Sequence, residues 1–120
     1  MRIAVLSLHT SPAAQPGQGD AGGMNVYVRA TAAELARAGH TVEIFTADPL
    51  APTTGTVELA PGVRLHQLDT SARDKTALAD DVPALAAALA AHPAYAGCEL
   101  IWAHYWISAL AGLALTEHPT

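Results

Sequence analysis

The first 47 residues follow the order strand, glycine-rich loop, helix, strand, and this order restricts the fold more than any other feature of the sequence. Residues 3–8 (IAVLSL) form a continuous apolar run, which is typical of a strand buried on both faces of a parallel sheet. The helix that follows has apolar residues at helical spacing: Met24, Val28, Ala32 and Leu35. It is expected to end at Gly39, before a second strand at 41–47 (TVEIFTA). These elements predict a βαβ unit with a right-handed crossover.

The rest of the chain continues the alternation of strands and helices. The expected elements are two short strands joined by a Pro-Gly turn at 57–68, a helix at 82–92, a strand at 98–104 and a helix from 106 to 117. Asp80 or Asp81 is a candidate cap for the helix at 82–92, and the polar residues before them are expected to form a connection. The alternation predicts an α/β fold, a three-layer Rossmann-like domain with a mostly parallel sheet.

The last residues, HPT, follow directly after a predicted helix. A doubly wound domain turns into its next strand at this point. Residues 1–120 are therefore expected to form an incomplete domain. The strand at 99–103 is expected to lie at a sheet edge that a further strand would cover.

The composition disfavours several classes of function. Eleven acidic and six basic residues give a formal net charge of −5, and the scattered basic residues form no stripe that could neutralise nucleic acid. The longest apolar stretch, residues 105–115, is far shorter than the about 20 residues of a membrane-spanning helix. Cys98 is the only cysteine, so no internal disulfide can form, and a reducing cytoplasmic setting is expected.

The loop after the first strand contains the pattern G-x-G-x-x-G at Gly17, Gly19 and Gly22. A dinucleotide fingerprint begins directly after its strand, whereas Gly17 comes about nine residues later, so NAD is disfavoured and no cofactor is expected. A plain surface loop is the other interpretation. However, the pair Gly22-Gly23 lies at the expected helix start, where free N–H groups favour an anion. Asp20 would compete with a pure anion, which favours a ligand with both phosphate and hydroxyl groups, such as a sugar nucleotide or sugar phosphate.

Three stretches of the chain resemble retaining GT-B glycosyltransferases. They are RIAVLSLHTSPAAQPGQGDAGGMNVYV at 2–28, LARAGHTVEIFT at 35–46 and ELIWAHYWISALAG at 99–112. They are similar to the N-terminal half of this family, most closely to its branch that glycosylates D-inositol 3-phosphate in mycothiol biosynthesis. Sucrose-phosphate and sucrose synthases share a similar helix start. The resemblance implies two Rossmann-like domains facing across a cleft, with residues 1–120 as the acceptor-side domain and the nucleotide-sugar domain absent.

The resemblance also implies which residues bind the two substrates. The acceptor-binding residues are His9, Asp20, Ala21, Gly22, Gly23, Met24, Asn25, Lys75 and Tyr105. The donor contacts of this domain come from Gln15, Pro16 and Gly23. No catalytic residue and no metal ligand is identified. The implied partners are a UDP-sugar donor and a sugar-phosphate or polyol-phosphate acceptor, and homodimer formation stays open.

The residues themselves support part of this assignment. Lys75 is the only lysine, and in a polar loop it offers a point charge to a phosphate, although a solvated surface lysine is the alternative. His9 and Tyr105 follow two strands of the predicted sheet, so they are expected at the same edge. Trp102 and Trp106 are predicted to pack in the core. The remaining predicted surface or turn histidines are His40, His66, His92 and His118. Asp80 and Asp81 are adjacent, and no third ligand lies near them in the sequence, so they do not form a metal pair.

The sequence therefore predicts a glycosyltransferase domain. The resemblance implies that the intact enzyme transfers N-acetylglucosamine from UDP-N-acetylglucosamine to inositol phosphate with retention. The segment of 120 residues alone is expected to be inactive, because the family's donor-gripping residues lie beyond Thr120. Two alternatives stay open, an enzyme of the sucrose-phosphate synthase type and a sugar-phosphate-binding module without catalytic activity.

Overall fold

A computed structural model describes residues 1–8, 23–47, 55–68, 75–103 and 105–117 of the chain. The elements are β1 (Arg2–Leu6), α1 (Gly23–Arg37), β2 (Thr41–Thr46), β3 (Gly55–Ala60), β4 (Val63–Gln67), α2 (Lys75–Asp80), α3 (Val82–Ala91), β5 (Leu100–Ala103) and α4 (Tyr105–Glu117). Every strand and helix expected from the sequence is present. The helix α2 is an addition.

The five strands form one sheet in the order β3-β4-β2-β1-β5. The strand β1 pairs in parallel with both β2 and β5, and β2 pairs in parallel with β4. Only β3 is antiparallel, because it forms a hairpin with β4. The predicted mostly parallel sheet is confirmed, as is the position of β5 at its edge.

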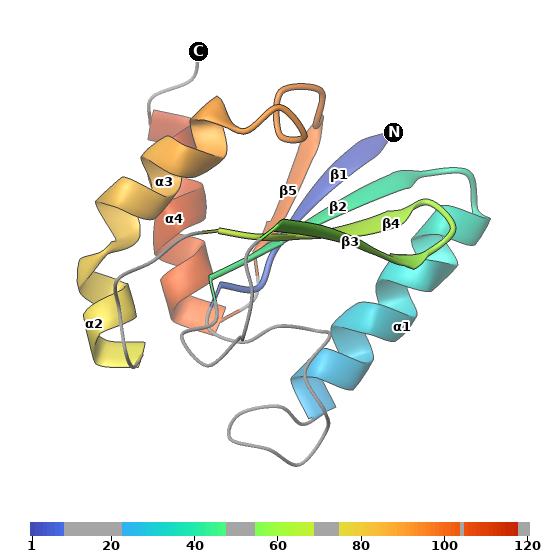
Figure 1. The fold of residues 1–120 in the computed structure, drawn as a ribbon, viewed down its shortest axis with the longest axis horizontal. Helices are drawn as coiled ribbons and strands as arrows, with labels where there is room; N and C mark the ends of the chain where they lie inside the picture. The colour runs from blue at the N-terminus through green and yellow to red at the C-terminus, as the bar shows by residue number, and fades with distance from the viewer. Residues whose placement is uncertain (9–22, 48–54, 69–74, 104, 118–120) are drawn as a thin grey trace.

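Helices cover both faces of this sheet (Figure 1). On one face α1 packs through Val28 and Ala32 against residues such as Ile3 and Ile44. On the other face α3 and α4 pack against alternate strand residues, which include Leu6 and Phe45. Because neighbouring strand residues point to opposite faces, β1 and β2 contribute to both cores. The predicted three-layer arrangement is therefore confirmed.

The helix α2 corrects the sequence prediction for the segment before α3. This segment was expected to be a polar connection, with Lys75 in a loop, but Lys75 is the first residue of a helix that ends at Asp80. The reason is the fully buried Leu78, which joins the core beneath α3 and α4. Asp81 occupies the expected N-cap position of α3, without a side-chain capping hydrogen bond.

The end of α1 agrees with the sequence prediction. Gly39 has a φ of +102°, and its N–H donates to the Ala36 carbonyl at 3.0 Å. The N–H of His40 donates to the Leu35 carbonyl at 3.1 Å. These two hydrogen bonds form a Schellman motif, which needs a left-handed residue at the position of Gly39.

We expect Gly39→Ala to lower the free energy of unfolding by about 1 kcal/mol, because an alanine is strained at this φ. A Cβ added at Gly39 would meet nothing within 4 Å, so the loss of stability would come from the backbone conformation and not from a steric clash. Gly112→Ala is the matched control, since Gly112 lies inside α4 and its added Cβ would make only ordinary contacts, at 3.8–3.9 Å. That control should stabilise the protein by about 0.5–1 kcal/mol. Urea unfolding of both variants measures the difference, and a neutral Gly39→Ala would contradict the motif.

Candidate functional site

The candidate site lies at the edge of the sheet where β1, β2, β4 and β5 end, here called the carboxyl edge. The helices α1, α2 and α4 all begin at this edge, whereas the start of β1 and the end of α4 lie toward the opposite end (Figure 1). Open α/β sheets bind ligands outside the carboxyl ends of their parallel strands. The fold therefore directs three helix starts and four strand ends to the position where a ligand is expected.

The structure brings several predicted site residues to this edge. Gly23, Met24 and Asn25 form the first turn of α1, while Lys75 begins α2 and Tyr105 begins α4. These residues come from three segments of the sequence. The remaining predicted site residues lie outside the described residues: His9, Gln15, Pro16, Asp20, Ala21 and Gly22.

Hydrogen bonds connect the chain segments that leave the strands at the carboxyl edge. The N–H of Leu8 donates to Ser108 Oγ of α4 at 2.9 Å, in a buried setting. The Leu8 carbonyl accepts the N–H of Ala47 at 3.1 Å. Next to it, the Thr46 carbonyl accepts the N–H of Leu68 at 2.7 Å. Ser108 was not predicted to be a functional residue, although a polar serine inside the apolar stretch 105–115 could have indicated a buried hydrogen bond.

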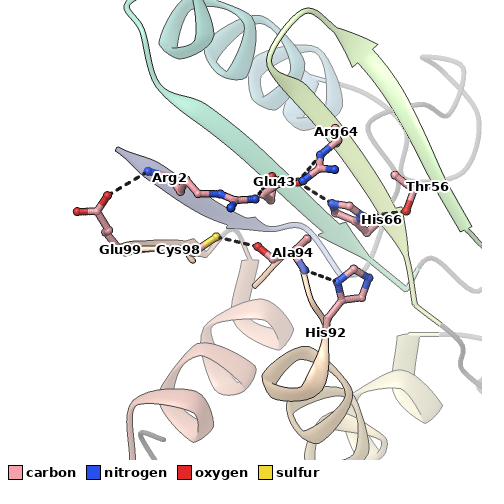
Figure 2. Close-up of polar contacts among 9 residues, drawn as sticks. All are labelled: Arg2, Glu43, Thr56, Arg64, His66, His92, Ala94, Cys98 and Glu99. Carbon is pink, nitrogen blue, oxygen red and sulfur yellow. Dashed lines mark hydrogen bonds and ion pairs between the residues drawn. The ribbon is translucent and has the colours of Figure 1, made fainter. Parts of the chain in front are cut away.

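A buried charge cluster, formed by Glu43, Arg2, Arg64 and His66, lies on the sheet face covered by α3 and α4 (Figure 2). The Glu43 carboxylate is fully buried and accepts hydrogen bonds from two arginines, from Arg2 Nη2 at 2.8 Å and from Arg64 Nη2 and Nε at 2.6 and 2.9 Å. His66 Nε2 lies 2.8 Å from the same carboxylate. Arg2 is the first residue of β1 and Glu43 the third of β2, so the cluster begins near the strand starts. Its two arginines are bound to Glu43 within the fold.

The prediction that His66 is a surface or turn residue is wrong. His66 is only 2% exposed, and its ring stacks on Phe45 with centroids 5.0 Å apart. Its Nδ1 lies 2.9 Å from Thr56 Oγ1 of β3. The half-buried His92 packs against both rings, at 4.8 Å from His66 and 5.3 Å from Phe45. Pairing of β4 beside β2 buries His66, which the local sequence does not reveal.

Burial and hydrogen bonding set the protonation of the groups around this cluster. Burial alone would raise the pKa of Glu43, but hydrogen bonds from Arg64, His66 and Arg2 outweigh it and lower this pKa from 4.5 to about 2. Burial lowers the pKa of His92 and raises that of Cys98. Cys98 Sγ donates to the Ala94 carbonyl at 3.4 Å, so this thiol lacks the features of a nucleophile.

In the part of the chain that the structure describes, no three or more His, Cys, Asp or Glu side chains are grouped so that they could hold a metal ion. None of the helices described combines the length and the apolar character that a membrane crossing requires. Trp102 is half-buried beside the α1 core and makes an edge contact with Tyr27, with centroids 6.1 Å apart, which confirms its predicted packing role.

Comparison with known families decides what kind of domain this is. The family model for the glycosyl transferase 4-like domain matches residues 22–120. The chain belongs to this glycosyltransferase family. The match includes the starts of α1, α2 and α4 and the ends of β2, β4 and β5, whereas β1 precedes it.

Curated relatives of this glycosyltransferase domain have one name in common. D-inositol 3-phosphate glycosyltransferase from Rhodococcus erythropolis is 45% identical over 92% of the chain and 26% of the relative. The proteins of that name from Mycolicibacterium smegmatis and Pseudarthrobacter chlorophenolicus are 44% and 41% identical over 92% and 97% of the chain, covering 27% and 29% of their own lengths. The glycosyltransferase domain thus spans less than a third of these relatives.

A solved structure confirms the fold of the glycosyltransferase domain. Sucrose-phosphate synthase from Thermosynechococcus elongatus superposes with a TM-score of 0.87 and 32% identity, over 98% of this chain and 30% of that chain. The mixed five-stranded sheet with its helices therefore corresponds to part of a GT-B glycosyltransferase.

Proposed function

We propose that residues 1–120 form the acceptor-side domain of a retaining glycosyltransferase that transfers N-acetylglucosamine from UDP-N-acetylglucosamine to D-inositol 3-phosphate. The observation that carries this proposal is that α1, α2 and α4 all begin at the carboxyl edge of the sheet (Figure 1). Gly23, Lys75 and Tyr105 are the first residues of these helices, and in this proposal they contribute to one site for a ligand with phosphate and hydroxyl groups. The names of the curated relatives support the same acceptor.

Each of these residues has a distinct role in the proposal. The Lys75 ammonium binds the acceptor phosphate as a point charge. Gly23, as the first residue of α1, lets the donor diphosphate approach free N–H groups at the helix start. Tyr105 offers a hydroxyl that both donates and accepts hydrogen bonds to the polyol. His9, Asp20 and the other residues of the glycine-rich loop complete the acceptor site in this proposal.

The proposed reaction depends on positioning and on stabilisation of the leaving group. The acceptor hydroxyl attacks the anomeric carbon while UDP departs from the same face of the sugar, so the configuration is retained. The acceptor proton leaves with the UDP, and the glycosidic bond forms as the bond to the diphosphate breaks. Groups held in the correct geometry supply most of the rate enhancement in such a step.

A second candidate is a glycosyltransferase of the sucrose-phosphate synthase type, which the structural similarity to that protein favours. Isothermal titration calorimetry of the chain with D-inositol 3-phosphate and with fructose 6-phosphate tests the choice. We expect saturable binding of the inositol phosphate and weaker binding of the hexose phosphate. The opposite preference would favour the second candidate, and binding of neither ligand would contradict both.

We also expect the chain alone to show no sugar transfer, because it covers less than a third of its curated relatives. In this proposal, most residues that bind the nucleotide-sugar donor belong to the part of those relatives that the chain does not match. The test is incubation with UDP-N-acetylglucosamine and D-inositol 3-phosphate, followed by chromatography of the products. Turnover at about 1 per second or faster, which is ordinary for an enzyme, would contradict this expectation.

A further inference from the structure

The end of β1 is held by a side chain that lies 100 positions further along the sequence. Strands β1 and β5 pair in parallel, with Leu6 opposite Ala103, where β5 ends. Two residues later, the same register places Leu8 opposite Tyr105, which already begins α4. The sheet therefore offers no strand partner beside Leu8 on this side. The fully buried Ser108 Oγ accepts the Leu8 N–H instead, at 2.9 Å.

Leu8, which Ser108 ties to α4, is also bonded to the segment that follows β2. The Leu8 carbonyl accepts the N–H of Ala47, which follows β2. The neighbouring Thr46 carbonyl accepts the N–H of Leu68, which follows β4. Leu8, Ala47 and Leu68 are all buried. The residues that leave β1, β2 and β4 are thus tied into the carboxyl edge, and Ser108 joins them to α4.

We propose that Ser108 is a positioning residue of the acceptor site. It ties Leu8, the residue before His9, to the helix that begins at Tyr105. Ser108 lies about one helical turn after Tyr105, so the two move together as parts of one rigid helix. This inference rests on the proposed function, in which His9 and Tyr105 bind the same acceptor.

Physical chemistry explains why the hydroxyl matters. A buried backbone N–H without a partner is costly, so Leu8 would not keep its position once the acceptor oxygen is removed. A shift of the chain at Leu8 would move the end of the β1 segment relative to the start of α4. Because the proposed site needs groups from both segments to contact one small ligand, such a shift weakens binding even though no ligand-contacting group is lost.

Ser108→Ala removes the hydroxyl with little change in volume and tests the tether directly. In the variant we expect the Leu8 amide to exchange with solvent at least about tenfold faster, as measured by NMR hydrogen exchange, while the Val5 amide inside β1 keeps its protection. Leu89→Val is the control. Leu89 is equally buried but lies near the end of α3, away from the start of α4 (Figure 1). Leu89→Val should change the exchange rates of the Leu8 and Val5 amides to the same extent. An unchanged exchange rate of the Leu8 amide in Ser108→Ala would show that Ser108 does not hold the end of β1.

Calorimetry with D-inositol 3-phosphate tests the role in binding. We expect Ser108→Ala to weaken this ligand roughly tenfold and Leu89→Val to leave its affinity unchanged, with circular dichroism as the check on folding. Equal affinities in the two variants would overturn the positioning role. If the unmodified chain does not bind the inositol phosphate, the proposed function fails together with that role. The exchange rate of Leu8 then still decides whether Ser108 holds the end of β1.

Discussion

Replacement of Glu43 by alanine is expected to lower the free energy of unfolding by about 3 kcal/mol at pH 7. Removing one partner of a buried ion pair typically costs about 3–5 kcal/mol, because the remaining charge is left uncompensated. Arg2 and Arg64 have side chains that are 40% and 45% exposed, so water can hydrate them and the lower end of this range applies. His66 is buried and loses its carboxylate partner outright. The expected loss is large beside the 5–15 kcal/mol of a typical domain.

Glu34→Ala is the matched control for this prediction. Glu34 is also paired with an arginine, Arg37, but both side chains are mostly exposed on α1. An exposed ion pair of this kind contributes about 0–1 kcal/mol. Urea unfolding followed by circular dichroism compares the two variants. Similar midpoints for Glu43→Ala and Glu34→Ala would contradict the structural role assigned to the buried charge cluster.

The same cluster makes stability depend on pH in the acidic range. Because the pKa of Glu43 falls from 4.5 to about 2 on folding, the stabilisation is fully present above pH 4.5. It is lost as the pH falls toward 2, where the folded protein also takes up the proton. The total is about 3 kcal/mol. Glu43→Gln cannot titrate, so its unfolding midpoint should change much less between pH 5 and pH 2 than that of the unmodified chain.

The strands and helices could be predicted from the sequence because each carries a local signal. The apolar run at 3–8 predicted a strand buried on both faces, and β1 contributes to both cores. Gly39 predicted the end of α1, and its left-handed conformation gives the reason. The helix α2 was missed because its six residues are too few for a clear periodicity. Its position depends on burial of Leu78 beneath other helices, which is a tertiary effect.

The buried charge cluster could not be predicted, because it depends on the register between distant strands. Glu43 lies opposite Arg64 in the pairing of β2 with β4, and opposite Ala4 in the pairing with β1. His66 follows Arg64 by two residues and therefore shares its face of the sheet. In the sequence these residues are isolated charges in three strands. Only the parallel register makes them neighbours.

The location of the candidate site could be predicted from the sequence, but the hydrogen bonds that hold its segments in place could not. Parallel strands direct their carboxyl ends to one edge, so Tyr105 was expected there, whereas Lys75 was assigned to the site by the resemblance. The helices that Lys75 and Tyr105 begin, α2 and α4, both start at this edge. The hydrogen bond between Leu8 and Ser108 depends on β5 ending before β1 does. No spacing in the sequence shows how far each strand extends. Supporting contacts of this kind therefore require the structure.

Replacement of Lys75 by alanine is expected to weaken the binding of D-inositol 3-phosphate by roughly 10- to 150-fold. This range corresponds to a charged hydrogen bond worth about 1.5–3 kcal/mol. The position of Lys75 supports a binding role, because a cation in the first turn of a helix is disfavoured by the helix dipole. Its removal should therefore not destabilise the fold. A stabilising structural role at this position would predict the opposite effect on unfolding.

Arg37→Ala is the matched control for Lys75→Ala, since each variant removes one positive charge from the chain. Arg37 lies at the other end of the molecule, in the last turn of α1, so its loss tests for a general effect of net charge. Calorimetry with D-inositol 3-phosphate should show a loss of affinity for Lys75→Ala alone, and the loss should shrink at high salt because the lost contact is electrostatic. Equal affinities in the two variants would remove Lys75 from the acceptor site. The phosphate of the acceptor would then have to be held by groups outside α2, and a glycosyltransferase of the sucrose-phosphate synthase type would become the stronger proposal.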